Sequence, residues 1–294
     1  MDHRALIASI PSEAKESLQK RSDAAGLRHL ALYGALLAAT STCIAFRVPL
    51  WPLFVLPQGI LLVFLFTLSH ECTHKTPFRS GWLNDVIGHL VSIPIALPFT
   101  WFRYFHLAHH KWTNHPENDP ELSGKPRPGN WRDLLIYLSG WTYWAAMAQV
   151  LIRNAINRID APYLPARQHG AMRLEARLLL GLYLAAVLSL FYSMTLFWLW
   201  FLPVLIAQPF LRLYLLAEHG MCPPVANMLE NSRTTFTNRI VRFLAWNMPY
   251  HTEHHAFPNV PFHQLPALHG WTKAHLKSTS DGYSEFAVDY VKSL

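Results

Sequence analysis

The sequence predicts an all-α integral membrane protein with four transmembrane helices in two hairpins, interfacial helices, and a helical cap on the cytosolic side. Hydrophobic residues make up 51% of the 294 residues and charged residues only 15%, whereas soluble domains carry about 25% charged residues. Long stretches carry no charged side chain, and the basic residues are spread unevenly along the chain. Disordered chains combine low hydrophobicity with high charge, so this composition excludes disorder.

The cysteines exclude two classes of small domain, those stabilised by disulfides and those stabilised by zinc bound to thiolates. The chain has three cysteines, Cys43, Cys72 and Cys222, and no CxxC pair. Three thiols cannot build the disulfide framework of a small secreted protein. Without a CxxC pair, a thiolate zinc ribbon is excluded as well.

Four spans are expected, near 28–47, 50–69, 176–196 and 198–217. A bilayer-spanning helix needs about 20 mostly apolar residues, and the first two stretches meet this requirement. Residues 178–211 carry no charge, and this run is too long for one span but fits a tight hairpin of two. Backbone polar groups cannot remain unpaired in lipid, so all four spans are expected to be helices.

Two further uncharged stretches are weaker candidates for crossing the membrane. Residues 86–102 include His89 and two prolines, and residues 134–152 include Gly140 and two tryptophans. We expect both stretches to form interfacial or re-entrant helices. Proline and glycine gather at 125–129, which predicts a loop there.

The whole chain, 1–294, is expected to form one membrane domain, because no linker, repeat or low-complexity tract divides it. The first 28 residues are polar and contain no short apolar core, so no cleaved signal peptide is expected. With four crossings, Arg47 is the only basic residue on the outer side, and basic residues mark the cytosolic side. Both termini are therefore expected in the cytosol, and residues 70–175 and 218–294 are expected to be cytosolic or interfacial.

The histidines are the candidate functional residues of this sequence. Nine of the 17 histidines fall into four clusters. The motif HECTH directly follows the second expected span, HLAHH comes next, a single histidine lies at the end of the fourth span, and HTEHH comes last. The clustered histidines are His70, His74, His106, His109, His110, His219, His251, His254 and His255.

Spacing within the clusters predicts metal ligands. On a helix, positions i, i+3 and i+4 share one face, so each triplet places three imidazoles together. Imidazole is a ligand for iron, zinc, copper and nickel. Nine ligands are too many for one tetrahedral zinc ion and fit two metal ions with four or five nitrogens each. Seven other histidines are expected to be interface residues: His3, His29, His89, His169, His263, His269 and His275. His115 lies close to the second cluster but outside its helical face, so it is not included among the expected ligands.

A shared metal site also constrains the topology. The clusters must lie on one side of the membrane, so neither the segment between His74 and His106 nor the segment between His110 and Arg153 can cross once. This is the reason for expecting interfacial helices in both segments.

Acidic and basic residues beside the clusters are candidates for supporting roles. A ligating imidazole usually donates its other N–H to a carboxylate or carbonyl. The acids near the clusters are expected in that role or as solvated acids on a basic face: Glu71, Asp119, Glu218 and Glu253. Nearby arginines are expected to bind an acyl headgroup, an acidic electron donor or anionic lipid headgroups: Arg103, Arg233, Arg239 and Arg242.

The three motifs HECTH, HLAHH and HTEHH, in this order and placed after hydrophobic spans, resemble the histidine boxes of the membrane fatty acid desaturase superfamily. Its members include acyl-lipid, acyl-CoA and sphingolipid desaturases, alkane hydroxylases, and carotene hydroxylases and ketolases. The flanking sequences FHLAHHKWTNHPENDPEL and WNMPYHTEHHAFPNVPFHQLP look like those of bacterial acyl desaturases. The resemblance covers roughly residues 30–270.

The resemblance implies a dinuclear non-haem iron centre that uses dioxygen to remove hydrogen from an unactivated C–H bond of a lipid acyl chain. By position, all nine clustered histidines would be iron ligands. Some members carry an asparagine four residues before the histidine equivalent to His219, where this chain has Leu215, and Asn247 is a possible substitute. The resemblance also implies a multi-pass protein of a bacterial inner membrane.

Electrons for this chemistry must come from a separate protein. The chain has no G-x-G dinucleotide fingerprint and no cysteine run for an iron–sulfur cluster. A ferredoxin or a cytochrome with its reductase is therefore expected as partner, and no nucleic acid.

Fatty acyl desaturation is the expected reaction, and hydroxylation of an acyl lipid, alkane or terpenoid on the same scaffold is the alternative. HECTH also fits the HExxH motif of zinc metalloproteases, which would leave about six histidines unexplained. A metal transporter or a bis-histidine haem protein would need polar residues or histidines in the middle of the spans. The spans here are apolar at their centres.

Overall fold

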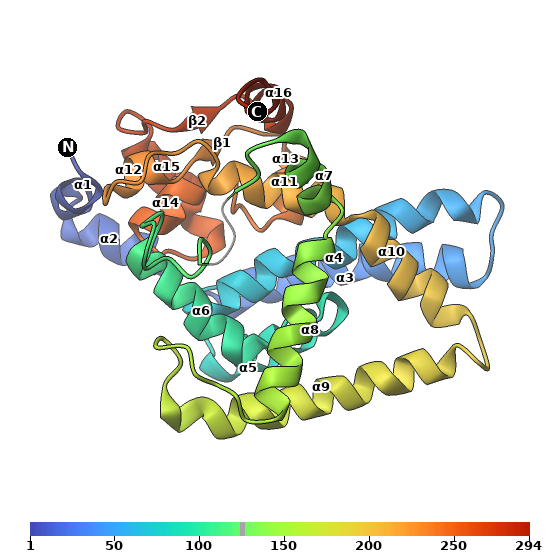
Figure 1. The fold of residues 1–294 in the computed structure, drawn as a ribbon. Helices are drawn as coiled ribbons and strands as arrows, with labels where there is room; N and C mark the ends of the chain where they lie inside the picture. Colours follow the sequence, from blue (N-terminus) through green and yellow to red (C-terminus); the bar gives the residue numbers. More distant parts are fainter. Residues whose placement is uncertain (124–126) are drawn as a thin grey trace.

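The computed structural model describes residues 1–123 and 127–294, so part of the loop expected at 125–129 lies outside the described residues. Among the described residues the fold is mostly helical (Figure 1). Its one sheet is a parallel pair of two-residue strands, β1 (Thr234–Thr235) and β2 (Thr279–Ser280). The all-helical class predicted from the sequence is therefore correct apart from this small pair.

The central element is α4 (Val55–His74), which follows α3 (Asp23–Ala45) after a short helical turn at 51–54. Ser22 begins α3 by accepting a hydrogen bond from the backbone N–H of Ala25, which satisfies one of the free donors at a helix start. Most residues of α4 are buried, because α3, α5, α6, α10 and α11 pack around it. Residues 12–45 and 51–74 are long and apolar enough to cross a membrane.

The stretch expected to form the last two spans differs from the expectation. Helix α9 covers His169–Ser189, so it begins and ends earlier than the expected 176–196. The expected 198–217 helix is divided into α10 (Leu202–Ile206) and α11 (Gln208–His219), with a bend of 40°. Pro209 explains the break, because proline has no N–H to donate to the carbonyl four residues earlier.

The two weaker stretches form sharply bent helix pairs. Helix α5 (Gly81–Ser92), extended by a turn to Ile95, meets α6 (Phe99–Trp112) at 98°, and α7 (Trp131–Leu138) meets α8 (Trp141–Ala155) at 57°. Gly140 joins the second pair with φ at +75°, a conformation that glycine adopts without strain. By length and composition the described residues hold two candidate spans, or up to five if every bent pair crosses.

A cap of short helices covers the C-terminal end of α4, and both chain termini lie on this side (Figure 1). Its elements are α1 (His3–Ser9), α2 (Ser12–Leu18), α12 (Met228–Asn231), α13 (Arg239–Leu244), α14 (His251–Ala256), α15 (Leu265–Thr272) and α16 (Tyr283–Lys292). Its buried apolar residues, such as Trp246 and Phe262, belong to the same hydrophobic core as those of α4, and the first two helices pack against α14 and α15.

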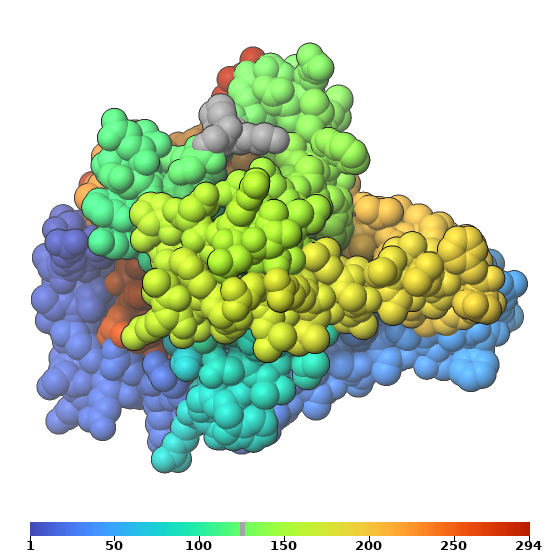
Figure 2. Space-filling model, turned by 60° about the horizontal axis from the view of Figure 1, so that its bottom comes forward, coloured from blue at the N-terminus to red at the C-terminus, as the bar shows by residue number. Residues whose placement is uncertain are grey.

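Apolar side chains are exposed along the opposite part of the molecule. Helix α9, in yellow, runs along the surface in Figure 2 towards the tip at the right. Its exposed residues include Leu174, Leu178, Leu184 and Leu188. A helix that is apolar on its outer face is typical of a protein in contact with lipid.

Candidate metal centre

Four segments deliver the nine clustered histidines to one place. They are the last turns of α4, the C-terminal half of α6, the end of α11, and α14. Each histidine lies on a helix, so its position follows from the packing of that helix at the cap. All nine imidazoles are buried except those of His74 and His110, which are half-buried.

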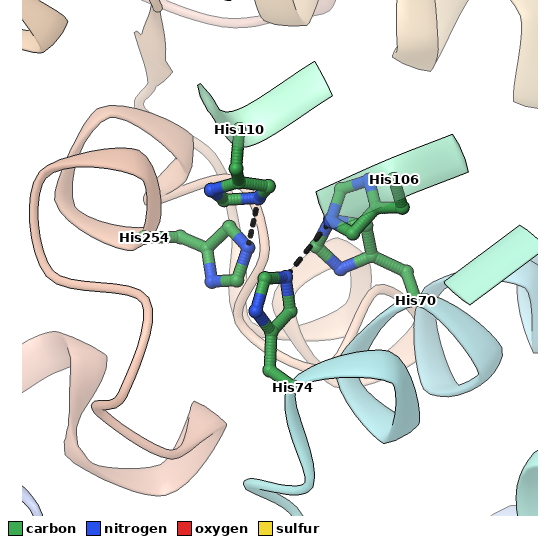
Figure 3. Close-up of side chains that lie close together, drawn as sticks. All are labelled: His70, His74, His106, His110 and His254. Atoms are coloured by element: carbon green, nitrogen blue, oxygen red, sulfur yellow. Dashed lines mark hydrogen bonds between the residues drawn. The ribbon is translucent and has the colours of Figure 1, made fainter. Parts of the chain in front are cut away.

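One group of five imidazoles surrounds a common point (Figure 3). One nitrogen from each lies within 4.8 Å of those of the others, and the five residues are His70, His74, His106, His110 and His254. The Nε2 atoms of His74 and His106 are 2.8 Å apart, and those of His254 and His110 are 3.2 Å apart. We call these residues the five-histidine group.

A second group lies beside the first. It contains His109, His219 and His255, whose nitrogens also lie within 4.8 Å of one another. His251 joins this group through its Nε2, which is 2.9 Å from the Nε2 of His219. The rings of His110 and His255 stack with their centroids 4.0 Å apart, so these two rings lie at the boundary between the two groups. We call these four residues the second group.

Each triplet is divided between the two groups. In α6, His106 and His110 belong to the five-histidine group and His109 to the second group. In α14, His254 belongs to the five-histidine group and His255 to the second group. Positions i+3 and i+4 point about 100° apart around a helix, so one helical face can serve two adjacent sites.

In the second group, the Nδ1 atoms face protein acceptors while the Nε2 atoms face the group. His109 Nδ1 is 2.9 Å from a carboxylate oxygen of Asp119, and His219 Nδ1 is 3.0 Å from the carbonyl oxygen of Asn231. His255 Nδ1 is 3.1 Å from the hydroxyl of Thr113. An imidazole whose Nδ1–H is held by an acceptor offers the Nε2 lone pair to a metal.

Two carboxylates make longer contacts of the same kind. Glu218 Oε1 lies 3.3 Å from His251 Nδ1, and Glu71 Oε1 lies 3.6 Å from His254 Nδ1. Glu71 is fully buried, and its other oxygen accepts hydrogen bonds from the Thr76 hydroxyl and the Phe262 backbone N–H.

Two of the expected supporting residues are placed elsewhere, and both expectations need correction. Glu253 accepts hydrogen bonds from Thr234, Thr272 and His269 instead of a clustered histidine. It is two positions from His251, and on a helix position i+2 points to the opposite face. The amide of Asn247 donates to the carbonyl of Phe262, on the far side of the loop that precedes α14.

Sequence reasoning missed Asn231 and Thr113. The first acts through its backbone carbonyl, which every residue possesses, so no sequence signal marks it. The second lies four residues after His109, and its hydroxyl donates to the His109 carbonyl, leaving a lone pair for His255. A threonine one helical turn after a histidine box was the available signal.

The remaining histidines lie outside both groups. His115 is exposed and contacts Asn118. His89 is paired with Glu175 through Nδ1 at 2.8 Å, and its side chain is about half exposed. His29 Nε2 is 2.9 Å from the carbonyl oxygen of Phe243.

The donor set fits a metal site. Burial and the neighbouring imidazoles lower the pKa values of His251, His254 and His255 well below their ordinary value, so these imidazoles are neutral at pH 7. Neutral imidazole is the form that binds metal. Several buried nitrogens in the described residues also lack a hydrogen-bond partner, among them both nitrogens of His70 and Nε2 of His255. Unpartnered buried nitrogens that face two groups of imidazoles are costly unless something binds them.

Comparisons with known proteins show which family the chain resembles. The model of the family described as fatty acid desaturase matches residues 46–287. An sn-1 acyl-lipid omega-3 desaturase (ferredoxin) from Nostoc sp. is 35% identical over 114 residues, which cover 39% of this chain and 31% of the relative. An sn-1 oleoyl-lipid 12-desaturase from Arthrospira platensis is 40% identical over 73 residues, covering 23% of this chain and 21% of the relative.

A plant relative shows the same similarity. The sn-2 acyl-lipid omega-3 desaturase (ferredoxin) of the Arabidopsis thaliana chloroplast is 41% identical over 69 residues, covering 24% of this chain and 16% of the relative. The chain thus spans about a third or less of the length of these relatives in the aligned segments. The family match, in contrast, extends over most of the chain and includes all nine clustered histidines. The chain belongs to the fatty acid desaturase family.

Proposed function

We propose that this protein is a membrane-embedded acyl-lipid desaturase that holds two iron ions in its nine clustered histidines. The observation that carries the proposal is the division of these histidines into two adjacent groups, one of five and one of four. Nitrogen-only donor sets of this kind suit iron, and the family match favours iron over zinc.

The five-histidine group would hold one iron ion, and His109, His219, His251 and His255 would hold the other. When bound, the iron pair supplies the means to activate dioxygen for attack on an unactivated C–H bond. Asp119, the Asn231 carbonyl and Thr113 hold Nδ1–H groups and so keep Nε2 directed at the metal. Burial keeps bulk water away from the site.

The overall reaction would convert a –CH2–CH2– unit of an acyl chain into –CH=CH–. Two hydrogens leave the chain, and dioxygen takes them up with two further electrons and two protons to give two water molecules. The electron donor would be a ferredoxin, because two of the relatives are named for this donor. A net charge of +7 would favour association with an acidic protein of this kind.

We infer four crossings, with both termini and the metal centre in the cytosol of a bacterial inner membrane, and one domain over 1–294. The bends of 98° and 57° support this topology, because a strongly bent pair can enter and leave on the same side. The proximity of α6 and α14 to the end of α4 also supports a shared side for the three histidine boxes.

Metal analysis of the detergent-purified protein tests the proposal. Wild type is expected to contain about two iron ions per chain, and His254→Ala is expected to lose iron because this residue belongs to the five-histidine group. The matched control is His89→Ala, which removes an imidazole outside both groups and is expected to retain iron. One zinc ion per chain, unaffected by His254→Ala, would instead support the HExxH protease.

Lipid analysis separates desaturation from hydroxylation. After expression in a bacterium that lacks its own desaturases, mass spectrometry of total lipids should show acyl chains lighter by two hydrogens. Chains heavier by one oxygen would indicate the hydroxylase alternative. Unchanged lipids from a protein that contains iron and receives electrons would contradict both reactions on the host lipids.

A further inference from the structure

A shallow, open depression of about 290 Å³ lies at the edge of the cap, outside both histidine groups. Its lining residues are His29, Arg239, Arg242, Phe243 and Asn247. It therefore contains two guanidinium groups and no carboxylate. We call this depression the arginine pocket.

The two arginines are free to bind an anion. They lie three positions apart on α13, so they share one helical face. Arg242 donates from one Nη to the hydroxyl of Tyr250 at 2.9 Å, and its buried Nε has no partner. Arg239 is exposed. Neither arginine is paired with a carboxylate in residues 1–123 or 127–294.

The walls of the pocket are held in place by interactions of their own. The His29 ring stacks on Phe243 with centroids 4.5 Å apart, and its Nε2 lies 2.9 Å from the Phe243 carbonyl oxygen. The ring also lies 4.1 Å from that of Trp246, which is fully buried. Asn247 donates to the Phe262 carbonyl. A site with walls that are already ordered loses little entropy when a ligand binds.

Exposed apolar residues lie beside the pocket arginines. On α13, Ile240 is 71% exposed between the pocket arginines, and Phe236 is 40% exposed just before the helix. His29 lies near the start of α3, where the first proposed span begins. Apolar and basic side chains mixed on one exposed segment are typical of contact with the headgroup layer.

From these observations we propose that the arginine pocket binds the phosphate group of an anionic glycerolipid. Guanidinium groups bind phosphate oxygens through paired, charge-assisted hydrogen bonds, and their planar geometry suits this ligand. The location rests on the membrane topology of the proposed function, but binding requires neither iron nor catalysis.

Hydrogen bonds of the lining residues also connect the pocket to the histidine groups. Arg242 contacts Tyr250, the residue before His251. Asn247 donates to the carbonyl of Phe262. The backbone N–H of Phe262 in turn donates to Glu71, which lies beside His254. A lipid bound here would therefore have its headgroup beside the loop that leads into α14.

Lipid binding to the full-length protein in detergent tests this proposal. Native mass spectrometry would count bound dioleoyl phosphatidylglycerol and, separately, dioleoyl phosphatidylcholine. Both lipids carry a phosphate, but only the first has net negative charge, so wild type is expected to bind it with clear preference. Each basic residue near a membrane contributes about fivefold to anionic lipid binding, so Arg239→Gln is expected to weaken binding about fivefold and the double variant with Arg242→Gln about 25-fold.

The matched control removes two exposed arginines outside the pocket, in the double variant Arg158→Gln/Arg167→Gln. It is expected to bind phosphatidylglycerol like wild type. Equal binding of the two lipids by wild type, or equal losses in the pocket and control variants, would overturn the proposal. Arg239→Gln alone keeps the test valid if the Arg242 variant does not fold, because Arg239 is exposed and unpaired.

Competition with inorganic phosphate distinguishes the two sources of the ligand. If the lipid is the ligand, phosphate should displace it only at concentrations far above that of the lipid. If phosphate displaces it at equal concentration, the pocket binds the free anion and the lipid proposal is wrong. Both results are independent of desaturase activity, so failure here leaves the proposed function intact.

Discussion

At the residue scale, the hydrogen-bond partner of Nδ1 determines that each imidazole of the second group presents Nε2 to a metal. Asp119 is the strongest of these partners, because it is fully buried and lies within hydrogen-bond distance of His109 Nδ1. Burial by itself would raise the pKa of Asp119, but the hydrogen bond with His109 and the backbone N–H donors outweigh burial and lower it. The carboxylate therefore stays ionised beside the imidazole.

Asp119→Asn is expected to weaken metal binding in the second group by about 10- to 100-fold, the usual effect of removing a partner of a ligating histidine. The amide keeps an acceptor oxygen for only one of the two backbone N–H donors, because that of Asn114 binds one carboxylate oxygen and that of Glu121 binds the other. Iron content per chain and product formation measure the effect. Asp133→Asn, an exposed acid on α7, is the control. Full iron content in Asp119→Asn would contradict the proposed orientation of His109.

At the element scale, α14 is too short to be stable alone, since isolated helices of fewer than about 12 residues are marginal in water. It has six residues, and all of them are buried. Glu253 connects it to β1 through Thr234 and to α15 through Thr272 and His269. This carboxylate therefore positions the helix that carries three of the clustered histidines.

Glu253→Ala is expected to destabilise the protein by about 3 kcal/mol, because Thr234, Thr272 and His269, the first two fully buried, each lose a hydrogen bond worth about 1 kcal/mol. Thermal unfolding of the purified protein measures this change. Glu117→Ala removes an exposed acid and should leave the unfolding temperature unchanged. An unchanged unfolding temperature in Glu253→Ala would show that α14 is held by other contacts.

Close packing of α4 against α10 gives a second prediction at this scale. A Cβ atom at Gly59 would lie 2.1 Å from the Pro203 carbonyl oxygen, so Gly59→Ala must separate the two helices. The expected cost is about 1–3 kcal/mol, measured by thermal unfolding. Gly34→Ala on α3 meets nothing within 4 Å and should be neutral or stabilising. Equal stability of the two variants would mean that α10 moves without cost.

At the scale of the whole molecule, the buried, neutral imidazoles of α14 make stability depend on pH. The folded-state pKa values of His251, His254 and His255 lie well below the ordinary 6.5 because of burial and neighbouring imidazoles. At these three positions the unfolded chain therefore takes up protons below about pH 6.5, whereas the folded chain does so only at a pH well below that value. Stability that is present above pH 6.5 is lost as the pH falls.

The metal-free protein is expected to unfold at progressively lower temperature from about pH 7 to pH 5. Chelation followed by thermal unfolding across this range measures the effect. Bound metal should raise the unfolding temperature at pH 7, and this gain should shrink at acidic pH because protons compete for the same nitrogens. A metal-free protein with equal stability at pH 7 and pH 5 would contradict neutral, buried imidazoles.

The sequence by itself determined the helical class, the apolar helices and the identity of the clustered histidines. Helix periodicity and apolar length are local properties, so they can be read without the fold. The four expected spans were only partly correct, because a bend such as the one after Ala207 depends on how proline and neighbouring helices are accommodated.

Only the tertiary structure decided how the histidines are shared between two groups. His109 and His110 are adjacent in sequence but belong to different groups, because helix rotation directs them to different sides. The same holds for Glu253, which faces away from the cluster, and for the Asn231 carbonyl, which faces it. These contacts join residues far apart in the chain, so they depend on the packing of whole helices rather than on local spacing.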